Sequence, residues 1–198
     1  MRHSAFFVGI GAVLLLSLIL SGCGVRSIPT ALNEVEATWS EVLNQYKRRS
    51  DLIPNLVNIV KGYAAHEKET LLAVVDARAK ATQTQVSTNQ LTPESLRQFS
   101  QAQAGLGSAL SRLMVVVERY PELKANENFR DLQVQLEGTE NRITVARYRY
   151  IQSIKGFNNL ITVPPESWYN SWVLKHEKKP QFSVEDEAVV KQVPTVKF

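Results

Sequence analysis

The sequence contains a single cysteine, Cys23, so no disulfide can form within one chain. It contains only 3 histidines, and His66, which precedes Glu67, has Thr70 where a zinc-binding helix needs a second histidine. The formal net charge is +4 without a long basic run, which is a weak basis for nucleic-acid binding. We therefore expect no disulfide scaffold, metal centre or cofactor, and no nucleic-acid partner.

Proline and glycine are sparse between residues 30 and 160, as long helices require. Apolar residues recur there at steps of three and four, so each segment presents one apolar face. Long amphipathic segments joined by short polar connections bury these faces most simply in a bundle. The predicted fold is all-α, an antiparallel four-helix bundle with long amphipathic helices and an irregular C-terminal tail.

The turn signals divide this region. Pro54, with Ser50 and Asp51 as possible N-caps, predicts a break or sharp bend over residues 48–54. The polar residues 82–90 form a loop, and Thr92 with Pro93 starts the next helix. A helix that ends at Pro121 and a last one that starts near residues 125–128 complete the bundle.

The N-terminus is a membrane-targeting segment, because residues 5–20 read AFFVGIGAVLLLSLIL without a charge. A membrane-spanning helix needs about 20 apolar residues, so this run is short for a span. We divide the chain into a signal peptide (1–22), a short linker (23–29), the helical bundle (30–162) and the tail (163–198). In the tail, Trp168, Tyr169 and Trp172 either pack on the end of the bundle or contact lipid, and we favour packing.

Polar residues on or beside the apolar faces have two interpretations. The first is an acid–base cluster and the second is a set of buried groups that fix the register of the helices, and we favour the second. Gly105 and Gly107 lie within a predicted helix without a preceding strand, so we interpret them as sites of close helix contact. The polar residues concerned are Glu67, Arg78, Gln103, Glu140 and Arg142.

The motif LSGC at residues 20–23 resembles the bacterial lipoprotein signal, in which an aliphatic and two small residues precede an obligatory cysteine. The resemblance implies diacylglyceryl transfer to the sulfur of Cys23, cleavage before Cys23 and acylation of its amino group. Several acyl chains hold a protein stably on a membrane. Gly24 resembles the pattern of lipoproteins that are sent to an outer membrane. We therefore expect a lipid-anchored protein of the bacterial cell envelope, with the bundle outside the cytoplasm.

A second resemblance covers most of the chain after Cys23. The runs DLIPNLV, GYAAHEKE, YPELKANENF and LEGTENRI, and the closing PTVKF, resemble the LemA family of bacterial membrane-associated helical-bundle proteins. This resemblance implies a four-helix antiparallel bundle behind an N-terminal membrane segment. It implies no molecular function.

We expect a non-enzymatic interaction or scaffolding module at the envelope. The candidate contact site is the loop YPELKANENF, with Glu122, Lys124, Asn126 and Glu127, because loops expose polar groups without a fold requirement. One alternative is an envelope enzyme that uses the carboxylates of the bundle in a polar pocket. Another is a bundle held by an uncleaved single membrane span.

Overall fold

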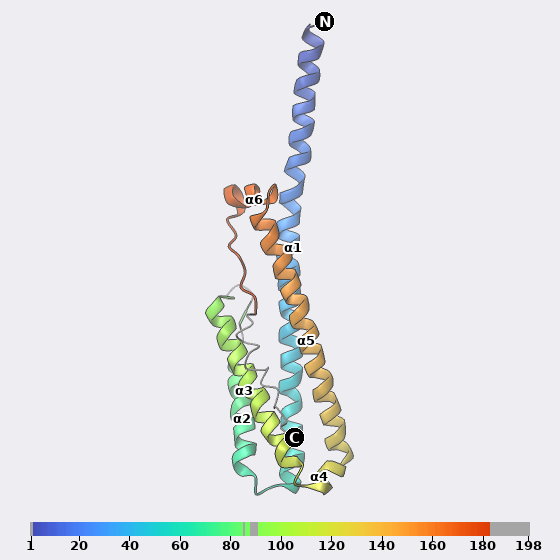
Figure 1. Cartoon of the computed structure of the whole chain (residues 1–198), viewed down its shortest axis with the longest axis vertical. Helices are drawn as coiled ribbons and strands as arrows, with labels where there is room; N and C mark the ends of the chain where they lie inside the picture. Colours follow the sequence, from blue (N-terminus) through green and yellow to red (C-terminus); the bar gives the residue numbers. More distant parts are fainter. Residues whose placement is uncertain (1, 85, 88–90, 183–198) are drawn as a thin grey trace, which may run out of the picture. The chain divides into compact units, whose positions relative to one another are not determined.

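The computed structural model describes residues 2–84, 86–87 and 91–182, and for residues 2–24 it describes the helical backbone alone. Every regular element in this part of the chain is helical (Figure 1). The all-α prediction is therefore confirmed for these residues, whereas the antiparallel four-helix arrangement stays a prediction. The elements are α1 (Arg2–Tyr63), α2 (Lys68–Gln83), α3 (Pro93–Val117), α4 (Pro121–Ala125), α5 (Glu127–Thr162), α6 (Glu166–Tyr169) and the π-helix η2 (Asn170–Leu174).

The chain divides into two compact units. The first unit comprises Met1–Ala37 and Gln152–Lys179, and the second comprises Thr38–Ile151 and Pro180–Phe198. Both α1 and α5 contribute residues to each unit. Among the residues whose side chains the structure describes, which begin at Val25, no helix has a stretch both long and apolar enough to cross a membrane.

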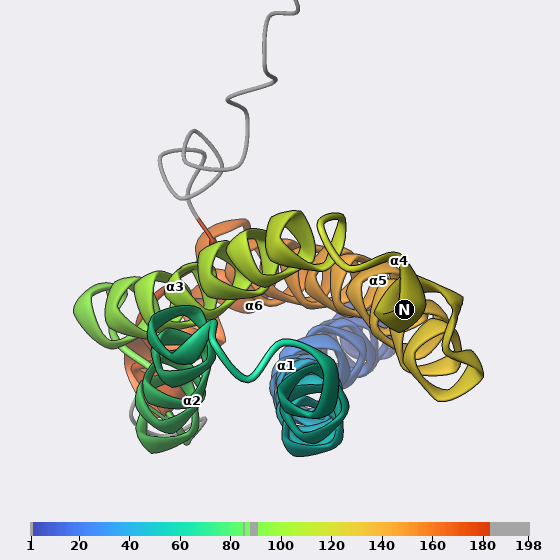
Figure 2. The same ribbon diagram turned by 90° about the horizontal axis from the view of Figure 1, so that it is seen from below.

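The second unit has a core drawn from five helices. Its apolar residues recur at steps of three and four along each long helix, because residues with this spacing share one face of a helix. α2 lies along α3, as Figures 1 and 2 show. The core residues are Ile53, Leu56, Val60 and Ala64, Leu71, Val74 and Ala81, Leu106, Ala109, Leu110, Leu113 and Val117, Leu123, and Phe129, Leu132 and Leu136.

An aromatic cluster around Trp39 extends this core. Trp39 is fully buried, and its ring lies 5.4 Å from that of Phe99 and 5.0 Å from that of Tyr150, between centroids. Phe182 completes the cluster, with its centroid 6.2 Å from that of Trp39. The indole Nε1–H donates to the carbonyl of Val86 at 2.8 Å, so burial leaves no unpaired donor on this side chain.

The predicted break at residues 48–54 is wrong, because α1 is continuous from Arg2 to Tyr63. Proline inside a helix removes the N–H that would bond to the carbonyl four residues earlier, here that of Ser50. The structure supplies another donor: Nε of Arg78, on α2, donates to the Ser50 carbonyl at 2.8 Å. The ring of Pro54 lies on the exposed side of the helix. A side chain from a neighbouring helix thus replaces the missing backbone hydrogen bond.

Two further boundaries differ from the sequence prediction. The described part of the expected linker at residues 23–29 is helical and belongs to α1. Within the tail, expected to be irregular, residues 166–174 form α6 and η2. The remainder of the tail, residues 183–198, lies outside the described residues.

Candidate polar groove of the second unit

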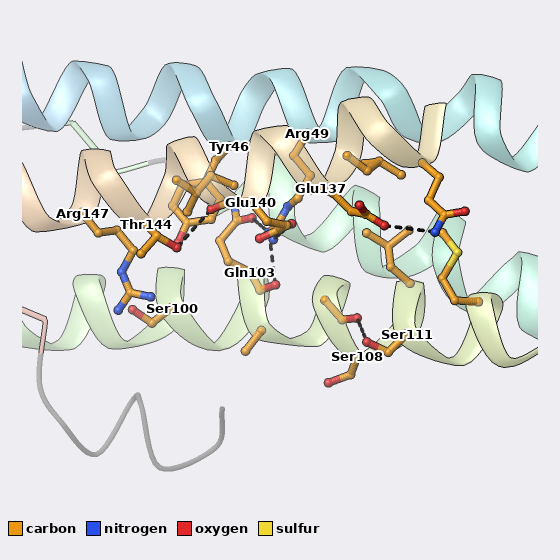
Figure 3. Close-up of a pocket in the computed structure, with 17 residues that line it drawn as sticks. Tyr46, Arg49, Ser100, Gln103, Ser108, Ser111, Glu137, Glu140, Thr144 and Arg147 are labelled. Carbon is orange, nitrogen blue, oxygen red and sulfur yellow. Dashed lines mark hydrogen bonds and ion pairs between the residues drawn. The ribbon is translucent and has the colours of Figure 1, made fainter. Parts of the chain in front are cut away.

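A groove of about 640 Å³ opens between α3 and α5, with two residues of α1 in its lining (Figure 3). Most of its lining side chains carry hydroxyl, amide or charged groups. The residues that matter for the argument below are Tyr46 and Arg49 from α1, Ser100, Gln103, Gly107 and Ser108 from α3, and Glu140 and Arg147 from α5.

Arg49 is the centre of a buried polar network, since the residue is only 4% exposed. Its Nη1 donates to Oε1 of Glu140 at 2.9 Å. Its Nη2 donates to the side-chain oxygen of Gln103 at 2.5 Å and to the backbone carbonyl of the same residue at 3.2 Å. The amide of Gln103 donates in turn to the carbonyl of Ala81 at 3.2 Å. The network therefore links α1, α2, α3 and α5. That it fixes the register of these helices stays a prediction.

Tyr46 lies beside this network, with the guanidinium of Arg49 5.0 Å from its ring centroid. Burial raises the pKa of the Tyr46 hydroxyl, and the positive charges of Arg147 and Arg49 oppose that shift. Tyr46 is therefore neutral at physiological pH and can serve as a hydrogen-bond donor.

The groove lining carries buried hydrogen-bond donors without acceptors. Among the described residues, Nε of Arg49 and the hydroxyl of Ser100 are buried and have no hydrogen-bond partner. Figure 3 shows the guanidinium of Arg147 at the same end as Ser100. The guanidinium of Arg147 lies 4.4 Å from the ring centroid of Phe182, and in the described part of the chain no carboxylate forms an ion pair with it. This end is suited to a group that accepts hydrogen bonds and carries negative charge.

The α3 wall of the groove is made of small residues, which keep it open. The prediction that Gly105 and Gly107 allow close helix contact is wrong, because a Cβ atom at either position would meet nothing within 4 Å. Gly107 lies in the groove lining together with Ser108 and Ser111. These residues leave room beside the helix instead of admitting a neighbouring helix.

The other polar residues singled out from the sequence lie apart from this groove or at its edge. Glu140, whose side chain is 49% exposed, lines the groove but is engaged by Arg49. Glu67 lies outside it, and its Oε1 accepts from Nη2 of Arg119 at 2.9 Å and from the hydroxyl of Tyr120 at 3.1 Å. The hydrogen bond to Glu67 raises the pKa of Tyr120. Arg142 is exposed.

Sequence reasoning did not identify Tyr46, Ser100 or Arg147 as site residues. Arg147 follows Ala146, a fully buried residue of the α5 apolar face, and therefore lies at the edge of that face. A positively charged residue at the edge of an apolar face is the sequence pattern that could have indicated Arg147 as a site residue. Ser100 follows the buried Phe99 in the same way.

The candidate loop YPELKANENF is more ordered than predicted, since residues 121–125 form α4. The Asn126 side chain caps the next helix: its Oδ1 accepts from the backbone N–H of Phe129 at 3.0 Å, and its Nδ2 donates to the Tyr63 hydroxyl at 3.0 Å. Lys124 pairs with Glu118 at 2.5 Å. Glu122 and Glu127 are exposed, and the proposed contact role of the four residues stays a prediction.

Cys23, the predicted site of lipid attachment, lies outside the residues whose side chains the structure describes. Lipidation of Cys23 therefore stays a prediction. The described residues also hold no group of three or more potential metal ligands.

The sequence profile of the LemA family matches residues 38–198. The chain belongs to the LemA family. The match begins one residue before Trp39 and contains the whole groove lining, together with residues 152–179 of the first unit.

Two curated relatives are magnetosome proteins. The chain is 25% identical over 153 residues to the magnetosome protein MamQ of Magnetospirillum gryphiswaldense, which covers 69% of this chain and 56% of that protein. It is 36% identical over 64 residues to the magnetosome protein MamQ 2 of Paramagnetospirillum magneticum, covering 32% of this chain and 24% of that protein. The chain thus spans about half the length of the first of these relatives, and about a quarter of the second.

Proposed function

We propose that this protein is a membrane-anchored helical-bundle lipoprotein that acts as an interaction module at the bacterial envelope. In this proposal α1, α2, α3 and α5 form an antiparallel four-helix bundle, and acyl chains on Cys23 hold it on the membrane. The groove between α3 and α5 is the docking site, and it receives a protein segment that presents an acidic side chain.

One observation carries this proposal, the excess of unpaired donors at the Arg147 end of the groove. The Arg147 guanidinium hydrogen-bonds to Tyr46 but has no carboxylate partner among the described residues, and the buried Ser100 hydroxyl has no hydrogen-bond partner. A carboxylate satisfies both, because it accepts several hydrogen bonds and binds a guanidinium through two of them. The open wall at Gly107 and Ser108 leaves room for the backbone that carries it.

The rival proposal is an envelope enzyme in which Glu140 acts as acid or base. The ion pair between Arg49 and Glu140, at 2.9 Å, weighs against it because the carboxylate already has a charged partner. Glu67, the other candidate acid, lies outside the groove and pairs with Arg119. The two candidate carboxylates therefore do not line the same groove.

Site-specific photo-crosslinking in native cells tests the docking site. A photoreactive residue at position 108, which is exposed in the groove, should give a crosslinked product that Arg147→Glu abolishes. Arg142→Glu is the matched control, since Arg142 is an exposed arginine of the same helix outside the groove, and it should leave the product intact.

Three outcomes would contradict the proposal. A product that survives Arg147→Glu shows that the acidic contact is absent. A product from position 124 and none from position 108 moves docking to the predicted YPELKANENF site. If Glu140→Gln abolishes the cellular phenotype of the protein while the crosslink is retained, the enzymatic alternative is favoured instead.

A further inference from the structure

The first unit displays two tryptophans on its surface. Trp168 is 58% exposed and Trp172 is 83% exposed. They are separated by four residues in the consecutive helical segments α6 and η2, so they lie on one side of the chain. Val163 and Val173 extend the same apolar segment and are also more than half exposed. The prediction that these tryptophans pack on the end of the bundle is therefore wrong.

Hydrogen bonds hold the backbone of the segment that carries these exposed tryptophans. Asn170 is buried and holds the chain that follows: its Oδ1 accepts from the His176 N–H at 2.9 Å, and its Nδ2 donates to the His176 carbonyl at 3.1 Å. The His176 ring lies 5.9 Å from the ring of Phe157 on α5.

Asn158 of α5 makes a second reciprocal pair. Its Oδ1 accepts from the Lys179 N–H at 2.9 Å, and its Nδ2 donates to the Lys179 carbonyl at 3.1 Å. Side chains of α5 thus fix the backbone on the C-terminal side of η2, whereas the indoles point away from the core. A large exposed apolar group on a fixed backbone marks an interaction surface, because folding alone does not require it.

Charge and position identify what this surface contacts. Lys175, Lys178 and Lys179 follow the tryptophans and outnumber the acidic residues Glu166 and Glu177 in the same segment. Tryptophan and lysine together are typical of segments at the boundary between lipid and water, where the indole enters the headgroup region and the ammonium pairs with anionic lipid.

Cys23, the predicted site of lipid attachment, lies in the same helix as residues that lie beside the start of the tryptophan-bearing segment. Ala31 and Glu34 of α1 line one hollow with Val163 and Glu166, so the start of the displayed segment lies beside this part of α1. Cys23 is eight residues before Ala31 in the same helix, about 12 Å along its axis. An uncleaved membrane span over residues 5–20 would bring the bilayer equally near.

We propose that the α6–η2 segment is a lipid-contact surface: Trp168 and Trp172 insert into the interfacial region of the membrane, and the following lysines pair with anionic headgroups. This surface orients the protein on the membrane, which attachment at one point does not achieve. The inference rests on the membrane attachment in the proposed function.

The test uses the full-length protein, purified from membranes and reconstituted in vesicles of phosphatidylethanolamine and phosphatidylglycerol. Brominated phosphatidylcholine in the vesicles quenches indoles that enter the lipid. Wild-type emission should be quenched, and the remaining emission of the W168F/W172F variant should not be, because its sole indole, Trp39, is fully buried in protein. Replacing Lys175 or Lys178 by Gln should weaken the contact about fivefold each, from the usual attraction of a surface lysine to anionic lipid.

The possible failures are distinct. If the wild-type protein does not float with the vesicles, membrane attachment itself is wrong. If it floats and its indoles are not quenched, the lipid-contact surface is wrong while attachment stands. If the Trp172 emission shifts to the blue with rising protein concentration and bromination has no effect, a second copy of the chain covers the surface, which also overturns the proposal.

Discussion

Trp39 and Trp172 differ in almost every respect, although both belong to helices of the same short chain. Trp39 is fully buried in the second unit, packs against Phe99 and Tyr150 and has its N–H paired, whereas Trp172 is 83% exposed in the first unit. The first arrangement stabilises the fold through packing. The second contributes little to the fold, and we propose that it contacts lipid. Both units bury apolar residues, but only the first exposes tryptophan side chains.

The largest loss of stability is expected when the buried indole of Trp39 is removed. Trp39→Ala should lower the free energy of unfolding by about 3 to 5 kcal/mol, because it deletes the centre of an aromatic cluster and leaves a cavity. Urea unfolding of the full-length protein in detergent, followed by circular dichroism, measures the change. A loss below 1 kcal/mol would show that this cluster is not part of the stabilising core.

The next largest effect is expected at Arg49. Arg49→Met keeps most of the side-chain volume but leaves the oxygens of Gln103 and Glu140 without their donor, so unfolding should become easier by about 2 kcal/mol. The same denaturation experiment measures it. Arg48→Met is the matched control, since Arg48 is exposed in the same helix, and it should have no measurable effect. Equal stability of the two variants would mean that the network has no net stabilising role.

A smaller loss of stability is expected where α1 continues through Pro54. Arg78→Met removes the donor to the Ser50 carbonyl and should cost about 1 kcal/mol. In a Pro54→Ala background the backbone N–H of residue 54 can bond to that carbonyl, so the same Arg78→Met change should cost less. A double-mutant cycle measures the coupling. Additive effects would show that Arg78 does not replace the missing helical hydrogen bond.

The smallest effect is expected at the displayed tryptophans. The W168S/W172S variant should unfold within about 0.5 kcal/mol of the wild type, because exposed side chains contribute little to folding. Tyr148→Ser, at an exposed aromatic residue of the second unit, is the control and should behave alike. A clear destabilisation confined to the tryptophan variant would mean that these indoles pack in the folded protein after all.

The sequence predicted the helical faces well, because burial of one stripe per helix is a local property of residue spacing. Val35, Trp39, Val42 and Tyr46 of the first stripe are all buried. It failed at Pro54, where the rule for an isolated helix was overridden by a donor from α2 that no local pattern reveals. Tertiary contacts decided that element.

The groove was only partly predictable. Gln103 and Glu140 were marked as polar residues on or beside apolar faces, which is where a buried network forms. Arg147 and Ser100 contribute through positions at the edge of such a face, and their grouping depends on how α3 and α5 lie along each other. For Trp172, packing on the bundle was favoured over lipid contact because aromatic residues are more often buried than exposed.

Membrane attachment underlies both the proposed function and the lipid-contact surface, and mass spectrometry of the native N-terminus tests it most directly. The account predicts that the mature protein begins at Cys23 and carries the mass of a diacylglyceryl group on its sulfur, with a further acyl chain on its amino group. A mature protein that begins at Met1, with an unmodified Cys23, would contradict lipid attachment.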